Sequence, residues 1–163
     1  MVFISGTMGV GKTTISKKLL KELPNSVFLD GDWCWDMNPF IVNEENKAMV
    51  VNNICYLLNS FIRNTSLQNI IFCWVMNKQE IVDIIKEKLV GQFNFYNIIL
   101  TISEKKLKEH YSKDIKEGIR ENKIDESLKY LKDYENIIGT KIEVKDDIKE
   151  TIKKIKDIIN TTE

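Results

Sequence analysis

The sequence is poor in cysteine, histidine and arginine. Its 163 residues include three cysteines, one histidine and two arginines, and no apolar run approaches the ~20 residues that a membrane-spanning helix needs. The cysteines are widely spaced and lie in apolar surroundings, which indicates reduced, buried thiols and argues against a disulfide framework or a metal cluster. We therefore expect a cytoplasmic protein that does not bind a membrane.

The chain also lacks an excess of charge of either sign. Lysine and arginine together number 24, as do aspartate and glutamate, so the net charge is zero. A neutral chain has no overall field that would steer it toward a nucleic acid polymer, so any attraction for phosphate must be local. With 43% hydrophobic residues over this length, we expect one globular domain spanning residues 1–163, as a monomer or homodimer.

What the chain does contain is a glycine-rich motif near its start. Residues 6–13 read G-x-x-x-x-G-K-T directly behind the apolar run Val2–Ile4. This pattern predicts a strand, a loop whose backbone N–H groups turn toward phosphates, and a helix whose positive end faces the same phosphates. The motif therefore predicts binding of ATP or GTP. The expected nucleotide-binding residues are Gly6, Thr7, Met8, Gly9, Val10, Gly11, Lys12, Thr13 and Thr14.

Three side chains at the end of this motif have distinct expected roles. Lys12 would reach the β- and γ-phosphate oxygens as a mobile point charge and take part in catalysis. The Thr13 hydroxyl would help to coordinate Mg²⁺, and Thr14 would offer one more hydroxyl donor. The alternatives are a chance match or a helix-capping turn. The expected strand before the motif and the expected helix after it argue against both.

Strand-like and helical segments alternate along the rest of the chain. Strands are expected at residues 2–4, 27–29, 70–75, 96–102 and 141–144. Helical periodicity follows each of them, with expected caps at Asn43, at Ser103, at Asp147, and in a capping box formed by Asn77 and Glu80. Such alternation requires right-handed crossovers, so we predict an α/β fold with a five-stranded parallel sheet covered on both faces.

The segment 104–138 departs from this pattern. It is polar, charged and helical in composition, its apolar stripe is thin, and it is broken at Gly118 and around Asn122-Lys123. We expect a helical hairpin that stands partly clear of the core and serves as a lid.

Ligands of parallel sheets bind beyond the carboxyl ends of the strands, so the residues there are the candidates for chemistry. Asp30-Gly31-Asp32 follows the second strand. In an extended segment both carboxylates point to the same side, where Asp32 could deprotonate or orient a phosphoryl acceptor and Asp30 could hold the water shell of Mg²⁺. The alternative is a turn built from ordinary turn-forming residues.

The segment 33–46 is too long and too aromatic for a simple connection. We expect it to wall the acceptor site with apolar side chains and a few polar ones, as in many small-molecule sites. The alternative is that these rings merely cover the edge of the sheet. The expected substrate-binding residues are Asp32, Trp33, Trp35, Phe40 and Trp74.

Geometry distinguishes the two arginines. Arg63 lies about seventeen residues along a helix that starts at the carboxyl edge, so at ~1.5 Å a residue it should be roughly 25 Å from the phosphates. Arg120 lies in the predicted lid and is the candidate for the catalytic cation that stabilises the transferring phosphoryl group or stacks on the base. The alternative is an ordinary solvated arginine on the surface. His110, in the same segment, is a weaker candidate.

These residues resemble the nucleoside-monophosphate-kinase-like branch of the P-loop proteins, particularly shikimate, gluconate and adenylylsulfate kinases and chloramphenicol phosphotransferases. The resemblance rests on residues 6–14 and on Asp30-Gly31-Asp32. It implies a three-layer P-loop NTPase fold with strand order 2-3-1-4-5 and ligands at the carboxyl ends of the strands. It also implies ATP and Mg²⁺ as cofactors, a closing lid, and an adenine site bordered by residues 144–146.

The sequence departs from that family in two respects. The third strand ends without the aspartate of a Walker B motif, and the lid contains one arginine where the family often has two or more.

We predict an ATP-dependent kinase acting on a small-molecule, nucleoside or nucleotide acceptor. The alternative is a nucleotide-binding regulatory module with slow ATP hydrolysis. A GTPase or motor-type ATPase fits least, because the chain lacks an N-K-x-D motif and a strand-three aspartate.

Overall fold

The computed structural model describes residues 1–118 and 123–161. Its described residues contain five strands, all parallel, in the order β2-β3-β1-β4-β5. This arrangement confirms the predicted fold class and strand order. The strands are β1 (Val2–Ser5), β2 (Ser26–Asp30), β3 (Asn69–Cys73), β4 (Tyr96–Thr101) and β5 (Thr140–Glu143).

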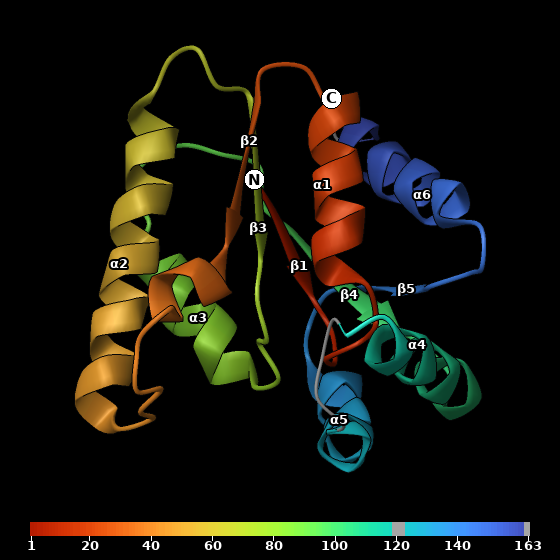
Figure 1. The fold of residues 1–163 in the computed structure, drawn as a ribbon. Helices are drawn as coiled ribbons and strands as arrows, with labels where there is room; N and C mark the ends of the chain where they lie inside the picture. Colours follow the sequence, from red (N-terminus) through yellow and green to blue (C-terminus); the bar gives the residue numbers. More distant parts are fainter. Residues whose placement is uncertain (119–122, 162–163) are drawn as a thin grey trace.

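Helices cover both faces of the sheet (Figure 1). On one face lie α1 (Lys12–Glu22) and α6 (Ile148–Asn160), and on the other lie α2 (Glu44–Arg63) and α3 (Gln79–Glu87). The two helices of the segment 104–138, α4 (Glu104–Lys116) and α5 (Ile124–Leu131), lie beyond the carboxyl ends of the strands. Two short 3-10 helices, η1 (Gly31–Trp35) and η2 (Asp133–Asn136), complete the described elements.

The core consists of two apolar layers, one on each face of the sheet. Alternate residues of β1 belong to different layers: Ile4 packs beneath α1 and α6, whereas Phe3 packs beneath α2 and α3. The Phe3 ring makes edge-to-face contacts with the rings of Phe72 and Phe95, each at 4.9 Å between centroids. Because both faces are buried, the central strands β1 and β3 are mostly apolar, as expected for a parallel sheet, whereas the edge strand β5 exposes three of its four residues.

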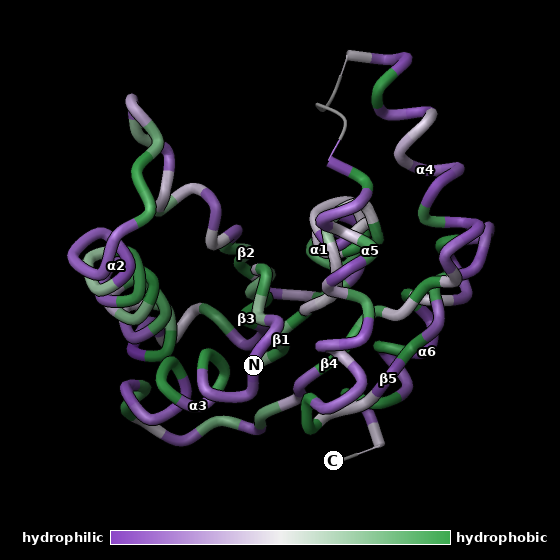
Figure 2. The backbone as a smooth tube through the Cα atoms, turned by 90° about the horizontal axis from the view of Figure 1, so that it is seen from below, coloured by the Kyte–Doolittle hydropathy of each residue, from purple (hydrophilic) through white to green (hydrophobic). Residues whose placement is uncertain are grey.

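The register of the strands brings their polar ends together. Ile4 lies beside Cys73 on one side and Ile98 on the other, and Asp30 of β2 lies beside Cys73. The residues after β1, β2 and β3 therefore meet at one edge of the sheet. Figure 2 looks onto this edge, with the start of α2 on one side and with α4 and α5 on the other.

The observed helix caps match the predicted caps in three cases and differ from the prediction in one. The side chains of Asn43, Ser103 and Asp147 accept hydrogen bonds from backbone N–H groups of α2, α4 and α6. The predicted capping box at Asn77 is wrong, because Lys78 occupies the N-cap position of α3. The Asn77 side chain instead donates to Asp133 Oδ2 at 3.2 Å and links the end of β3 to η2.

Within the described residues, no helix combines the length and the apolar character needed to span a bilayer.

Candidate active site

The loop between β1 and α1 adopts positive φ angles, which favour glycine, at three positions. Gly6, Gly9 and Gly11 have φ angles of +148°, +86° and +101°. A Cβ on Gly6 would stand 2.7 Å from the Leu100 carbonyl oxygen, and one on Gly9 would stand 2.7 Å from the Tyr111 ring. The glycines thus serve both the turn of the loop and the close approach of neighbouring elements.

The amino end of α1 opens at this loop. Gly11 is its N-cap residue and contributes no side chain, and the first turn, Lys12–Ile15, contains no carboxylate that would neutralise the positive end of the helix. Helix geometry leaves the first backbone N–H groups directed outward, and an anion is their natural partner. Lys12 Nζ donates to the carbonyl oxygens of Gly6 (2.8 Å) and Thr7 (3.1 Å), so its ammonium group lies over the loop.

Two loop residues that the sequence assigns to the nucleotide direct their side chains elsewhere. The Thr7 hydroxyl is buried and donates to the Ser127 carbonyl oxygen of α5 at 2.7 Å. Val10 is fully buried in the apolar layer beneath α1. At these two positions a phosphate would contact backbone N–H groups and not the side chains.

Thr13 and Asp30 form the polar centre of the site. The Thr13 hydroxyl donates to Asp30 Oδ2 at 2.8 Å, and Asp30 Oδ1 accepts from the Asp32 backbone N–H at 3.2 Å. Asp30 is only 5% exposed, so these contacts fix its carboxylate next to the start of α1. The two residues that the sequence assigns to the metal are therefore adjacent.

The oxygens of Thr13 and Asp30 suit a hard cation such as Mg²⁺, which binds through one or two protein oxygens together with substrate phosphates. The described residues contain no group of three or more His, Cys, Asp or Glu side chains that could hold a metal by themselves. Cys73, at the end of β3, is an unsuitable ligand, because burial, and secondarily the charge of Asp30, raise the pKa of its thiol to about 12. The donor set thus fits a cation that phosphates help to bind.

Asp32 lies in η1, two residues beyond the carboxylate that faces Thr13. Its side chain reaches solvent, but the surrounding protein removes part of its hydration, and this desolvation raises its pKa. The charge of Asp30 raises the pKa further, whereas Lys12 and a hydrogen bond from the Trp74 side chain oppose the rise. A carboxylate with a raised pKa is suited to accept a proton from a hydroxyl group.

Gly31 provides the space for this arrangement. A Cβ at Gly31 would stand 2.4 Å from Trp74 Cγ, so the absence of a side chain lets the indole of Trp74 pack against the backbone of η1. The indole donor then reaches Asp32.

The predicted aromatic wall is only partly assembled. Trp35 and Phe40 are 5.7 Å apart between ring centroids, and Trp35 and Trp74 both pack against the layer beneath α2 and α3. Trp33 packs instead edge-to-face on Phe28, which belongs to the layer on the α1 side. The structure therefore pairs Trp35 with Phe40, places Trp35 and Trp74 against the same apolar layer, and packs Trp33 against the other layer.

Helices α4 and α5 contact the glycine-rich loop directly. The Gly9 carbonyl accepts from His110 Nδ1 at 3.0 Å, and the Tyr111 ring covers Gly9. The hydroxyl groups of Tyr111 and Ser127 are hydrogen-bonded to each other, which joins the two helices. Arg120, the predicted catalytic cation, lies outside the described residues.

The start of α4 is also tied to the end of β5. Lys106 Nζ lies 2.8 Å from Asp146 Oδ1, and this pair holds the pKa of the exposed Asp146 carboxyl below its usual value. Residues 144–146 are those that the family resemblance associates with adenine. The ion pair brings them to the same end of the sheet as the glycine-rich loop.

Sequence reasoning missed the contacts of Thr7 with Ser127 and of Tyr111 with Gly9. Both join residues about a hundred positions apart, and polar helix residues such as Ser127 show no periodicity that would single them out. Gly9 was the available signal, since a glycine can mark a close approach by another element.

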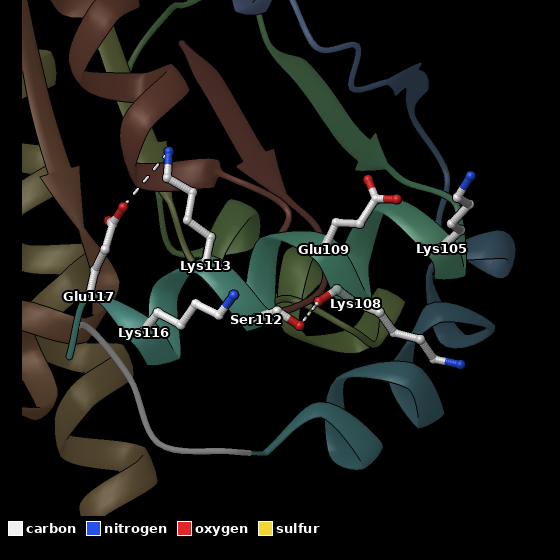
Figure 3. A pocket seen from close by; sticks show the side chains of 7 residues that line it. All are labelled: Lys105, Lys108, Glu109, Ser112, Lys113, Lys116 and Glu117. Carbon is white, nitrogen blue, oxygen red and sulfur yellow. Dashed lines mark hydrogen bonds and ion pairs between the residues drawn. The ribbon is translucent and has the colours of Figure 1, made fainter.

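A hollow of about 570 Å³ lies along the solvent side of α4 (Figure 3). Its lining comes from α4 and the residue after it, and consists mostly of lysines with two glutamates and a serine. The lining residues are Lys105, Lys108, Glu109, Ser112, Lys113, Lys116 and Glu117. The hollow includes none of the predicted acceptor-side residues.

Comparison with known proteins relates the chain to one family. The family model described as "AAA domain" matches residues 2–129, which include the glycine-rich loop, η1 and the helices α4 and most of α5. A search of curated proteins gives no significant match.

Several solved structures share the fold. A gluconokinase from Sinorhizobium meliloti 1021 aligns with a TM-score of 0.67 and 16% identity, over 93% of this chain and 86% of its own. A shikimate kinase from Acinetobacter baumannii aligns with a TM-score of 0.64 and 18% identity, over 99% and 93%. The Deinococcus radiodurans tunicamycin resistance protein aligns with a TM-score of 0.68 and 15% identity, over 97% and 94%. At these identities the likeness establishes the fold: that of the P-loop small-molecule kinases.

Proposed function

We propose that this chain, which belongs to the AAA domain family, is an ATP-dependent kinase that phosphorylates a small-molecule, nucleoside or nucleotide acceptor. The observation that carries this proposal is the pairing of Thr13 with Asp30 at the start of α1, with the Asp32 carboxylate two residues further on. One carboxylate faces the phosphate-binding loop, and the other is available to an acceptor. Two structural neighbours, named as gluconokinase and shikimate kinase, support the same activity class.

In this proposal the loop residues 6–14 bind the triphosphate of ATP. Backbone N–H groups of the loop and the positive end of α1 would contact the phosphates, and Lys12 would exchange its carbonyl partners for the β- and γ-phosphate oxygens. Thr13 and Asp30 would hold Mg²⁺. When bound, the cation would neutralise negative charge on the phosphates.

Asp32 is the proposed general base. Its carboxylate would take the proton from the acceptor hydroxyl as that oxygen forms a bond to the γ-phosphorus and the bond to the bridging oxygen of ADP breaks. The products are ADP and the phosphorylated acceptor. Trp35, Phe40 and Trp74 would contact the acceptor body, and Trp33 would contribute from the other side of η1.

Helices α4 and α5 are proposed to form the lid, with Arg120 between them as the cation that stabilises the transferring phosphoryl group. The contacts of His110 and Tyr111 with Gly9 support this assignment, because movement of these helices would change the packing around the loop. Arg120→Ala should lower kcat by at least about 100-fold if the arginine contacts the transition state. Arg63→Ala, at the far end of α2, is the matched control and should leave kcat unchanged.

The test of the proposal is a screen of hydroxylated compounds for ATP-dependent phosphorylation, with ADP release and phosphorus NMR of the product as readouts. Lys12→Ala should abolish the rise in Tm that Mg·ATP produces, because the loop loses its main cation. Asp32→Asn should retain that rise and lower kcat by about 10²- to 10⁴-fold. Intact ATP binding with no phosphorylated product from any compound would count against a kinase.

A nucleotide-binding regulatory module with slow ATP hydrolysis is the second candidate. The observation that favours it is Cys73, a buried thiol at the end of β3 where a Walker B motif has a carboxylate. In such a module Asp32→Asn would leave the slow hydrolysis unchanged. The response to this one substitution separates the two functions.

We further propose that the protein acts in the cytoplasm, since its three cysteines are free thiols. Its partners would be a nucleotide and a small-molecule acceptor, without a nucleic acid polymer or a membrane. A monomer or homodimer is expected, and light scattering of the purified protein would show which.

A further inference from the structure

Charge is distributed unequally between the two sides of the sheet edge that Figure 2 faces. Residues 30–49, which run from the end of β2 into α2, contain five carboxylates and a single ammonium group. That ammonium, Lys47, is paired with Glu44 at 2.7 Å. The carboxylates are Asp30, Asp32, Asp36, Glu44 and Glu45.

The opposite side carries the cations. Helix α4 contains five lysines and three carboxylates, and four of its lysines line the hollow in Figure 3. Lys12, between the two sides, lies over the glycine-rich loop. Helix α4 therefore carries two more ammonium groups than carboxylates, whereas residues 30–49, on the side that would receive the acceptor, carry four more carboxylates than ammonium groups.

Other elements extend the acidic side. Asp133 of η2 accepts a hydrogen bond from Asn77, which follows β3, and so brings another carboxylate next to the acceptor side. Lys78 and Lys132 adjoin these two residues in sequence, and both side chains are exposed to solvent. Exposed ammonium groups are strongly screened, so they offset only part of the negative field.

The acidic side also presents apolar surface to solvent. Phe40, Ile41 and Val42 are consecutive and are 67%, 46% and 57% exposed, and Met49 is 41% exposed on the second turn of α2. A patch of this kind next to a polar site commonly marks a surface that a ligand covers. The Trp35 indole N–H is buried and has no hydrogen-bond partner among the described residues.

We infer that the acceptor is an alcohol with an aromatic or otherwise apolar body that carries no carboxylate or phosphate group. This inference rests on the proposed kinase function and narrows its substrate class. The apolar side chains Phe40, Ile41 and Val42 cover the body of the acceptor, and the carboxylates around them favour a neutral or cationic substituent. An anionic acceptor would approach a segment with five carboxylates and one ammonium group, and charges within a Debye length, about 8 Å at physiological salt, are only partly screened from each other.

The test uses three matched alcohols: the para-aminomethyl, para-methyl and para-carboxylate derivatives of benzyl alcohol. They share one ring and one hydroxymethyl group and differ in charge. Binding to the Mg·ADP-loaded protein is measured by ligand-observed NMR, and phosphorylation in Mg·ATP by phosphorus NMR. The cationic and neutral members should bind at least about tenfold more tightly than the carboxylate, with detectable binding at about 10 mM.

A charge-reversal variant provides the second arm. Asp36→Lys combined with Glu45→Lys should shift the preference toward the carboxylate by at least about tenfold. Glu87→Lys combined with Asp83→Lys, on α3, gives the same change in net charge away from the acceptor segment and should not alter the preference. Phe40→Ala should weaken binding of all three members alike.

The inference and the proposed function can fail separately. Tighter binding of the carboxylate, equal binding of all three members, or no binding of the cationic and neutral members would overturn the inference. Phosphorylation confined to anionic acceptors would also overturn it while supporting the kinase. The expected order of binding, in a protein that transfers no phosphate to any alcohol, would support the charge preference and contradict the kinase.

Discussion

At the scale of single residues, the site depends on two carboxylates that lie close together and differ in environment. Asp30 is buried, accepts from Thr13 and the Asp32 N–H, and is held rigidly. Asp32 reaches solvent and has a raised pKa, because desolvation and the neighbouring Asp30 both disfavour its charge. This difference supports separate roles for them, one toward a cation and one toward a proton.

The raised pKa of Asp32 has a consequence for stability. In the unfolded chain the pKa should be near 3.8, so the folded state retains the proton to higher pH than the unfolded state. The free energy of unfolding contributed by this group therefore falls as pH rises from 3.8 through the folded-state pKa, and remains lower at neutral pH. Asp32→Asn removes the penalty, so the variant should be more stable than the original at neutral pH and lose this advantage as the pH falls toward 3.8.

Urea unfolding of both proteins at a series of pH values would check this prediction. Asp36→Asn, which changes an exposed carboxylate outside the Asp30–Asp32 pair, is the control and should change stability by less than about 0.5 kcal/mol. A variant Asp32→Asn that is less stable than the original protein at neutral pH would show that the carboxylate is favourably paired when folded.

At the scale of elements, the approach of α4 to the glycine-rich loop is a contact whose partners the sequence did not identify. Tyr111 and Leu107 of α4 lie where a side chain at position 9 would have to stand. His110, one turn from Leu107, bonds the carbonyl of the same glycine. Position 9 is therefore glycine for two reasons: its positive φ and the packing of α4.

A pair of alanine substitutions separates these two reasons. Gly9→Ala and Gly118→Ala both place a side chain at positive φ, at a cost of about 1–2 kcal/mol. Only Gly9→Ala also creates a clash, with the Tyr111 ring 2.7 Å away, whereas a Cβ on Gly118 would meet nothing within 4 Å. Gly9→Ala should therefore cost about 1–3 kcal/mol more in the free energy of unfolding, and should weaken Mg·ADP binding.

Denaturant unfolding and a nucleotide titration of the two variants would measure these effects. Equal losses of stability in both variants, with unchanged nucleotide affinity, would mean that α4 does not pack on the loop in solution.

The helix caps show how far local patterns extend at this scale. Asn43, Ser103 and Asp147 cap the helices that follow them, because a cap is a contact within a few residues and the sequence contains both partners. Asn77 had the same local pattern but bonds Asp133, fifty-six positions away in the chain. The Asn77 side chain therefore forms a hydrogen bond with a distant residue in place of capping α3.

At the scale of the whole molecule, one sheet separates two apolar layers, and β1 contributes to both. Loss of either layer would expose an apolar face of the sheet, so the layers should unfold together. The three tryptophans all lie at the carboxyl ends of β2 and β3, whereas backbone circular dichroism reports on every element. Tryptophan fluorescence and circular dichroism should therefore give coincident unfolding transitions.

Mg·ATP should shift both transitions equally, by about 2.7 kcal/mol at a ligand concentration 100 times Kd. A fluorescence transition that precedes the loss of circular dichroism would show that the acceptor side unfolds by itself and would contradict the single-domain prediction. The Lys12→Ala variant serves as the control for the effect of the nucleotide.

The sequence by itself determined the order of the elements, the fold class, the glycine-rich loop before α1 and the position of the D-G-D behind β2. These follow from local physics: hydrophobic periodicity, glycine conformations and short-range capping, together with the handedness of parallel crossovers. It also placed Thr13 and Asp30 at the same edge, because the carboxyl ends of parallel strands meet there.

Only the tertiary structure decided which side chains meet across that edge. Trp33 packs against Phe28 and Trp35 packs against Phe40, although Trp33, Trp35 and Phe40 belong to one short segment. The Thr7 hydroxyl donates a hydrogen bond to the carbonyl oxygen of Ser127. The indole of Trp74 packs on Gly31 and reaches Asp32. Such contacts depend on how the helices and loops pack around the sheet, and that packing is a compromise among residues far apart in the chain that no local pattern records.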